Sequence, residues 1–424
     1  GAEVTLYEMR PKVTTPAHQT DLLAEMVCSN SFRSDSPDNS SGLLKEEMRR
    51  LGSLILSCAD NCRVPAGMAL AVDRAAFAEE VTQRLALLPE VEILREEVTS
   101  LDPSSPTVIA SGPLTSQKLA QGIAKFTRDK YLYFYDAISP ILWGDSIDLT
   151  KAFMGSRYGK GGPDYLNCPL DREEYRRFRQ GLIEAEKVPL RDFEAAIFFE
   201  GCLPVEELAA RGEETLAHGP LKPVGLQHPE TGESYHAVVQ LRRENLSGEF
   251  YSMVGFQTRL TYPAQRQVFR SIPALAEARF LRYGSIHRNT FINSPRLLRP
   301  TLQLRSWPNL IFGGQLTGVE GYLESAATGL LAGLNGVRLL RGEPLLVPPE
   351  TTALGSLTSY LTRSSPVGFQ PMNINFGLFP PLRGRVRRRE RHQLILKRAR
   401  RDFEEWLREL PIPLSAISAD SKST

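Results

Sequence analysis

Two of the five cysteines, Cys28 and Cys202, have sequence neighbours that suit a reactive thiol. Cys202 shortly precedes Pro204 and Glu206, which mark the first turn of a helix. The dipole and free N–H groups of a helix N-terminus favour the thiolate, the nucleophilic form of cysteine. Cys28 lies where a short helical segment gives way to a polar loop, which suits a cleft. The alternative for each is an ordinary buried thiol, because cysteine often packs as a small hydrophobic residue.

The other three cysteines are predicted to be structural. Cys58 and Cys62 have no neighbouring histidine or further cysteine that would complete a zinc site. Cys168 has no basic neighbour or helix terminus that would activate it. An odd number of cysteines scattered along a long chain also argues for reduced thiols over a disulfide framework.

Residues 310–336 predict a buried strand, a glycine-rich turn and a helix of small residues. Glycines in such a turn let the backbone approach a ligand closely, and the N–H groups of the following helix point at that ligand. No Gly-Lys-Ser/Thr follows, which argues against a nucleoside-triphosphate site. Taken alone, the pattern fits a flavin site and a tightly packed structural helix equally well. The glycines concerned are Gly313, Gly314, Gly318 and Gly321.

Basic residues are concentrated near the end of the chain, although the net charge is only +2. Such a density would neutralise several phosphates of a nucleic acid. The equally weighted alternative is a solvated helix face, whose arginines pair with the acidic residues that follow at 402–405. Residues 383–401 contain Arg383, Arg385, Arg387, Arg388, Arg389, Arg391, Lys397, Arg398, Arg400 and Arg401, with Glu390 as the only acid.

The composition is that of a globular chain with a large core. At 424 residues and 42% hydrophobic content, it has room for two domains or for one domain with a large insertion. No run approaches the roughly 18 apolar residues of a membrane helix, and no signal segment opens the chain. We therefore expect a cytoplasmic protein with no membrane partner.

The coarse pattern predicts a nucleotide-binding domain of the α/β class, divided by an insertion. The first strand ends at Glu8, the position of the acidic residue that binds ribose hydroxyls in a dinucleotide-binding unit. Aromatic residues, prolines and short strands begin near residue 131. We expect a first part at 1–130, an insertion domain at 131–290 and a second part at 291–424. Further expected elements are strands at 68–72, 91–98 and 107–110, and helices at 42–52, 74–87 and 115–126.

Read together, the peptides resemble one family, the folate- and FAD-dependent tRNA (uracil-5-)-methyltransferases called TrmFO. The resemblance runs nearly from end to end. Its matching stretches include Leu-Tyr-Glu-Met-Arg-Pro-Lys at 6–12, Ala-Glu-Met-Val-Cys-Ser-Asn-Ser at 24–31, Ser-Gly-Pro-Leu-Thr-Ser at 111–116, Asp-Tyr-Leu-Asn-Cys-Pro at 164–169, His-Arg-Asn-Thr at 287–290, the glycine-rich segment, and Gly-Phe-Gln-Pro-Met-Asn at 368–373.

The resemblance implies an activity and its cofactors. The family methylates C5 of the T-loop uridine at position 54 of tRNA, with carbon from 5,10-methylenetetrahydrofolate. In the family's chemistry, reduced FAD receives the methylene group and presents it to uracil, and NADH or NADPH supplies electrons. The implied fold is a Rossmann-like FAD-binding domain of the glutathione-reductase type with a large α+β insertion domain.

The resemblance also assigns roles to residues. Cys28 and Cys202 would be the two functional cysteines, with the division of labour between them open. His287, in a polar loop, would stack on the folate, with Asn289 in the same site; an ordinary surface histidine is the alternative. The cofactor site would contain Glu8 on the ribose, Arg10, Gly112 on the adenine side, and Gly314, Gln315, Gly318, Gly321 and Tyr322 on the flavin side. The tRNA surface would be a basic helix at 386–401, with Arg387, Arg388, Arg391, Lys397 and Arg398.

The sequence departs from the family at its start. Members carry a Gly-x-Gly-x-x-Gly turn before the strand that ends at Glu8, and this chain begins after it with Gly1. That turn cradles the FAD pyrophosphate, so we expect a truncated product that binds FAD weakly or not at all. Two alternatives follow: a non-catalytic tRNA-binding protein, and a related FAD-dependent enzyme that modifies wobble uridines in tRNA.

Overall fold

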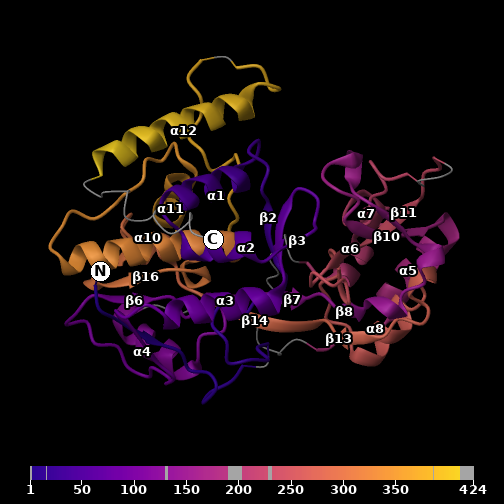
Figure 1. The fold of residues 1–424 in the computed structure, drawn as a ribbon, viewed down its shortest axis with the longest axis horizontal. Helices are drawn as coiled ribbons and strands as arrows, with labels where there is room; N and C mark the ends of the chain where they lie inside the picture. Colours follow the sequence, from indigo (N-terminus) through magenta and orange to yellow (C-terminus); the bar gives the residue numbers. More distant parts are fainter. Residues whose placement is uncertain are drawn as a thin grey trace.

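The computed structural model describes residues 2–15, 17–128, 132–189, 203–227, 232–384 and 386–410. Two hydrophobic cores organise these residues. The larger core draws on residues from 23–123 and again from 291–407, and the smaller one is formed within residues 142–278. Figure 1 shows the two units side by side, with the smaller unit on the right.

Parallel strand pairs join distant parts of the chain in the larger unit. Strand β1 (Val4–Tyr7) pairs in parallel with β5 (Val91–Leu94), and β6 (Thr107–Ile109) pairs in parallel with β16 (Trp307–Phe312). Parallel strands need a crossover connection between them, and here these connections contain helices, as expected for an α/β fold. The remaining strands of this unit are β2 (Ser31–Ser34), β3 (Arg63–Val64), β4 (Ala69–Val72) and β15 (Gln303–Leu304).

Polar caps set the beginnings of most helices in this unit. The side chains of Asn39, Ser53, Asp73, Ser116 and Thr352 each accept a hydrogen bond from a backbone N–H of the first helical turn, which otherwise lacks a partner. The helices they open are α1 (Ser40–Arg50), α2 (Leu54–Asn61), α3 (Arg74–Ala86), α4 (Gln117–Thr127) and α11 (Ala353–Arg363). Helix α10 (Tyr322–Leu340) packs against β16, and helix α9 (Ser294–Leu297) packs against α11.

The smaller unit is built on an antiparallel sheet with the strand order β13-β8-β12-β11-β10-β9. The α-helices in the described part of this unit are α5 (Arg172–Glu184), α6 (Val205–Arg211), α7 (Thr215–His218) and α8 (Tyr262–Phe269). The strands are β8 (Ile141–Trp143), β9 (Phe153–Gly155), β10 (Tyr165–Leu170), β11 (Ala237–Arg243), β12 (Phe250–Met253) and β13 (Phe280–Arg282).

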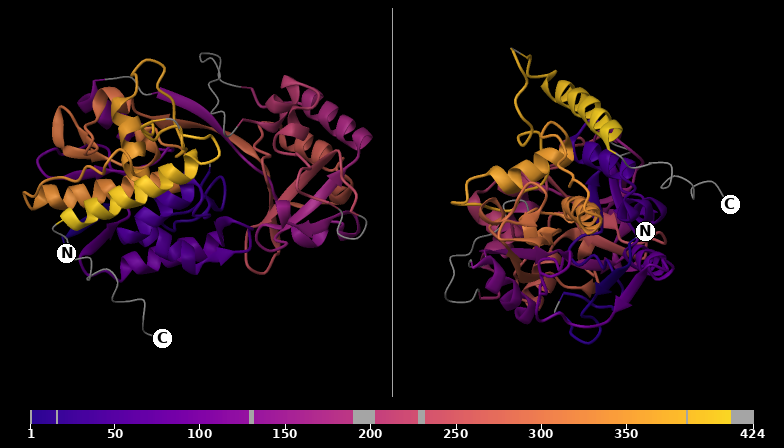
Figure 2. Two further views of the ribbon diagram at one scale, coloured as in Figure 1. Left: turned by 90° about the horizontal axis from the view of Figure 1, so that it is seen from above. Right: turned by 90° about the vertical axis from the view of Figure 1, so that its left-hand side faces the viewer.

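A two-stranded antiparallel ribbon connects the units. Strand β7 (Leu132–Ile138) pairs with β14 (Ser285–Phe291) along its whole length. Figure 2 shows these long strands running from one unit to the other. His287 and Asn289 therefore lie on a strand, and the expectation of a polar loop for His287 was wrong. The mixed polar sequence hid the strand, because, among its described side chains, β14 contributes only its last residue, Phe291, to the larger hydrophobic core.

The C-terminal helix was also misplaced by sequence. Helix α12 spans Arg391–Glu409, whereas the expected helix spanned 386–401. Arg387 and Arg388 thus precede the helix, where consecutive positive charges would oppose its dipole. The helix extends further because Phe403, Trp406 and Leu407 bury their side chains. None of the described helices has the length and apolar character needed to cross a membrane.

Candidate cofactor site and its cysteine

A cavity of about 460 Å³ opens in the larger unit, between the ends of β1, β6 and β16 and the start of α10. Segments from both ends of the chain form its walls, because the parallel strand pairs bring their carboxyl ends to one edge. Nine of the residues expected in the active site line it: Glu8, Arg10, Cys28, Gly112, Asn289, Gly314, Gln315, Gly321 and Tyr322.

Glu8 stands directly after β1 and is held by Arg10. Its carboxylate accepts hydrogen bonds from the Arg10 backbone N–H at 2.9 Å, from Nε at 3.0 Å and from Nη2 at 3.2 Å. Burial alone would raise the pKa of Glu8, but these bonds and the charge of Arg10 lower it below its ordinary value. Glu8 is therefore an ionised acceptor at the cavity wall, the state that binds ribose hydroxyls.

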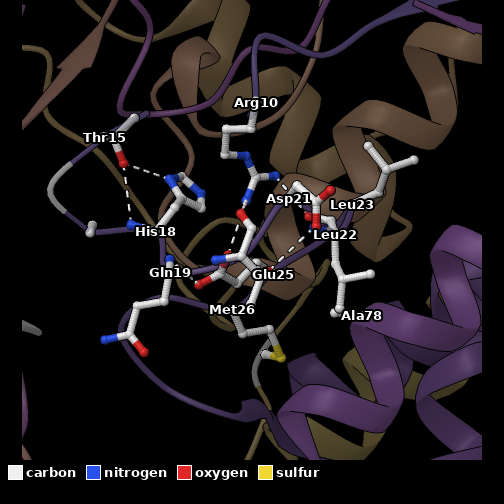
Figure 3. A network of polar contacts seen from close by, with 12 residues as sticks. Arg10, Thr15, His18, Gln19, Asp21, Leu22, Leu23, Glu25, Met26 and Ala78 are labelled. Atoms are coloured by element: carbon white, nitrogen blue, oxygen red, sulfur yellow. Dashed lines mark hydrogen bonds and ion pairs between the residues drawn. The ribbon is translucent and has the colours of Figure 1, made fainter. Parts of the chain in front are cut away.

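Glu25 completes the network around Arg10, as Figure 3 shows. Arg10 donates to Glu25 Oε2 at 3.0 Å and to the carbonyl oxygens of Thr20 and Leu22. Glu25 also accepts the backbone N–H groups of Gln19 and Thr20. Arg10 is 5% exposed and acts within the protein, so it orients Glu8 and the loop at 18–25. The sequence analysis missed Glu25, since nothing in its local pattern signals this role.

His18 is a second lining residue that the sequence analysis missed. Its Nδ1 lies 2.6 Å from Thr15 Oγ1. Burial and the charge of Arg10 lower the pKa of His18, so its neutral form is favoured. A neutral imidazole at this wall can accept or donate a hydrogen bond to a ligand.

Cys28 contacts the first residue of α10. The Tyr322 hydroxyl accepts the Cys28 backbone N–H at 2.9 Å, and its oxygen lies 3.2 Å from Cys28 Sγ. Burial, together with the neighbouring cysteine, raises the pKa of Tyr322 well above its ordinary value. Tyr322 therefore keeps its proton and remains a hydrogen-bond donor at neutral pH. Cys28 is half-buried and faces the cavity.

The glycine-rich turn contains two kinds of glycine. Gly314 has φ +71°, and a Cβ placed there would meet no atom within 4 Å, so the backbone faces open space at the cavity. Gly318 instead allows close packing, because a Cβ there would lie 2.6 Å from the Phe369 ring. The turn thus combines an open ligand-facing side with a packed side. Gly318 is not among the lining residues of the cavity.

The other cysteines differ from Cys28. Cys58, Cys62 and Cys168 are buried, as predicted, and burial raises the pKa of Cys62 and of Cys168 to about 12. Cys202 lies outside the described residues. The helix expected after it is present, because α6 begins at Val205 with Pro204 before it.

The residues expected to hold the folate, His287 and Asn289, lie on the ribbon between the units. Asn289 is fully buried and lines the cavity. The backbone of His287 pairs with Asp136 of β7, two positions from Asn289 along β14. The side chain of His287 falls outside what the structure describes.

The basic run separates into surface and structural residues. Lys397 is exposed, as are Arg387, Arg388 and Arg391. Arg398 instead donates to the carbonyl oxygens of Pro380 at 2.6 Å and Pro381 at 3.1 Å, and so anchors α12. The expected pairing within the helix is limited: Arg401 contacts Asp402 at 2.7 Å and Glu405 at 4.0 Å, whereas Glu404 pairs with Arg50 of α1.

Comparisons with known proteins give one consistent result. The sequence profile described as "Glucose inhibited division protein A" matches residues 1–344. The methylenetetrahydrofolate–tRNA-(uracil-5-)-methyltransferase TrmFO of Geobacter sulfurreducens is 57% identical over 408 residues, which cover 96% of this chain and 94% of the relative. The protein of the same description from Natranaerobius thermophilus is 56% identical over 407 residues, with the same coverage of both chains.

Solved structures agree on the fold. Aquifex aeolicus GidA superposes with a TM-score of 0.68 in one crystal form and 0.65 in another. The matches cover 98% of this chain and 74% and 71% of those chains, at 15% and 14% sequence identity. The arrangement of an α/β unit with an inserted second unit is therefore a fold already known from solved structures.

Proposed function

We propose that the cavity beside Cys28 is where this chain methylates a tRNA uridine, because it belongs to the TrmFO family of folate-dependent tRNA (uracil-5-)-methyltransferases. The protein is a tRNA methyltransferase that uses FAD and methylenetetrahydrofolate. We further propose the uridine at position 54 of the T-arm as its target and NADH or NADPH as its reductant. The observation that carries the assignment is the convergence of Glu8, the glycine-rich turn and Cys28 on one cavity.

The lining residues fit FAD. Glu8 offers an ionised carboxylate for ribose hydroxyls, and Gly112 lies at the end of β6 on the side proposed for adenine. Gly314, Gln315 and Gly321 lead into the N-terminus of α10, where free N–H groups favour an anionic group. Bound FAD would carry the one-carbon unit and the reducing electrons. The protein's own residues orient it and place Cys28 and Tyr322 beside it.

Uracil C5 is a weak nucleophile, and a cysteine thiolate supplies the activation, a role that suits Cys202 because of its position before a helix. A thiolate that adds to C6 moves electron density onto C5 and O4, so that C5 can attack a one-carbon electrophile. Loss of the C5 proton, a two-electron reduction of the one-carbon unit to methyl, for which bound FAD would supply the electrons, and departure of the thiolate then restore the ring. Cys28 is proposed as the other functional cysteine, beside the cofactor, and His287 and Asn289 are proposed to hold the folate.

The exposed basic residues at the end of the chain are proposed to bind the tRNA. Arg387, Arg388, Arg391 and Lys397 face solvent, where they can reach phosphates around the T-loop. Reaching a stacked base also requires its extrusion from the loop. Arg398 contributes to tRNA binding indirectly, because its hydrogen bonds to Pro380 and Pro381 hold α12 in position.

Methylation and tRNA binding, measured together on cysteine variants, test this function. Cys28→Ala should abolish 5-methyluridine formation on an unmodified tRNA transcript supplied with methylenetetrahydrofolate and NADH, while binding of that transcript is retained. Cys168→Ala, which removes a buried thiol of the second unit, is the matched control and should retain activity. A Cys28→Ala protein that methylates at the wild-type rate would refute the assignment. Wild-type protein that binds tRNA without methylating it would favour the non-catalytic alternative.

A further inference from the structure

Two aromatic rings stack at the start of α12, which lies on the larger unit (Figure 1). The imidazole of His392 lies against the ring of Phe376, with the ring centroids 4.1 Å apart and an angle of 13° between the ring planes. Phe376 in turn contacts the buried ring of Phe379 at a centroid distance of 6.0 Å. The hydrophobic core therefore supports the imidazole from below and favours one orientation of its ring.

His392 is exposed despite this stacking. Phe376 covers one face of the imidazole, so the remaining surface of the ring faces solvent. An aromatic ring held in this way can stack on a nucleobase, because every base has a flat π-face. Such a contact requires an unpaired base, which a loop of RNA provides and a continuous double helix does not.

The charge around the stacked pair favours a polyanion. Arg391 directly precedes His392 and is exposed. Glu390, the only acid of the basic run, lies 3.9 Å from Arg387 and 3.7 Å from Arg389. Three guanidinium groups of this stretch thus share one carboxylate. A partner protein with an apolar surface would bury these charges without compensation, whereas the phosphates of RNA would neutralise them.

The segment that carries Phe376 starts at the wall of the cofactor cavity. Asn373 Nδ2 donates to the carbonyl oxygen of Glu320, a lining residue, at 2.7 Å. The backbone N–H of Ile374 donates to Glu324 Oε1, in the first turn of α10, at 3.0 Å. Three residues of chain span at most about 11 Å, which bounds the distance from Asn373 to Phe376. This is about three spacings between stacked bases, each about 3.4 Å.

We propose that His392 stacks on an unpaired base of the tRNA T-loop, close to the target uridine, and that Phe376 is the positioning residue beneath it. The proposal rests on the proposed function and adds a base contact to the phosphate contacts of the basic run. Phosphate contacts attract the RNA, but they do not select which nucleotide of the loop stands at the cavity. A base stacked on His392 holds the loop in place while the uridine leaves its own stack.

Filter binding of an unmodified tRNA transcript, without folate or NADH, tests this proposal. The measurements are made at about pH 8, above the range in which histidine side chains ordinarily titrate. His392→Ala should weaken binding about tenfold, because one stacking contact is lost. The dependence of affinity on salt should stay unchanged, since no phosphate contact is removed. His392→Phe should restore most of the affinity, whereas His392→Gln, which is polar without a ring, should not.

Gln393→Ala is the matched control, because Gln393 is the next residue of α12 and is also exposed. It should leave the affinity unchanged. Phe376→Leu should weaken binding by releasing the imidazole, and the His392 variants keep the proposal testable if Phe376→Leu fails to fold.

Equal affinity of wild type and His392→Ala would overturn the stacking contact, as would a His392→Phe protein that binds no better than His392→Ala. The proposed function fails separately. Wild type that binds tRNA without methylating it, together with weak binding by His392→Ala, would refute the methyltransferase assignment and leave the stacking contact standing.

Discussion

Arginine occurs in two contrasting settings in this protein. Around the loop at 26–30, two half-buried guanidinium groups, those of Arg74 and Arg242, make short hydrogen bonds to the loop. In the basic run at 383–401, most side chains are exposed, and two of them, Arg387 and Arg389, approach Glu390. In the first setting little water is present, so the dielectric constant is low and the electrostatic interactions of each charge are strong. In the second setting, solvent screens these interactions. The first setting suits holding one loop in place, and the second suits attraction of a polyanion.

The largest effect is expected from removing the carboxylate of Glu244, which pairs with Arg74. Glu244→Gln leaves Arg74 without its buried partner, which should lower the free energy of unfolding by about 3–5 kcal/mol. Urea unfolding at neutral pH measures this, with Glu249→Gln, an exposed neighbour, as the control. Equal free energies of unfolding for the two variants would show that Arg74 does not depend on its buried partner.

The basic run should respond to charge reversal with a change in binding alone. Arg388→Glu combined with Arg391→Glu should weaken tRNA binding about tenfold at moderate salt and flatten its salt dependence, because fewer phosphates are neutralised. Filter binding between about 50 and about 200 mM salt measures both effects. Arg305→Glu places the same reversal on the exposed turn before β16 and should have little influence. Unchanged affinity of the double variant would remove this run from the tRNA surface.

Lys397 and Arg398 are adjacent residues of α12, and comparing them distinguishes an exposed basic side chain from a structural one. Arg398→Met should lower the free energy of unfolding by about 1 kcal/mol, since its bonds to Pro380 and Pro381 are lost. Lys397→Met should leave stability unchanged and weaken tRNA binding. Thermal unfolding and filter binding on both proteins provide the comparison. If Arg398→Met weakened tRNA binding and Lys397→Met lowered stability, α12 would contact tRNA through its other face.

The sequence predicted the parts of the site that lie within single motifs. Glu8 follows a strand, and Gly314 and Tyr322 follow a recognisable strand and turn, so their convergence could be anticipated from parallel-sheet geometry. Glu25 and the arginines around the loop at 26–30 could not. Arg74 and Arg242 come from distant elements, and only the packing of two units brings them to one loop. The start of α12 was misjudged because arginine occurs in turns and helices alike, whereas the buried apolar face marks the helix.

Lys45 supplies an effect on stability that depends on pH, and it shows how burial acts on a lysine. Its side chain is fully buried in α1, with Nζ donating to the Ser34 carbonyl oxygen at 2.9 Å, and burial lowers its pKa to about 8. Between about pH 8 and about pH 10.4, the unfolded chain retains a proton that the folded protein has released. The free energy of unfolding should therefore rise with pH across this window in wild type, relative to Lys45→Met.

Urea midpoints at about pH 7.5 and about pH 9.5 measure the difference between the two proteins. Other groups titrate in this range, so only the wild-type rise in excess of the Lys45→Met rise reports on Lys45. Equal pH dependence in the two proteins would show that Lys45 keeps an ordinary pKa. A lysine in place of Arg74 would shed its proton in the same way when desolvated, and Glu244 would lose its counter-charge. Guanidinium remains protonated under the same burial, so arginine can stabilise a buried carboxylate across the whole pH range in which the protein is folded.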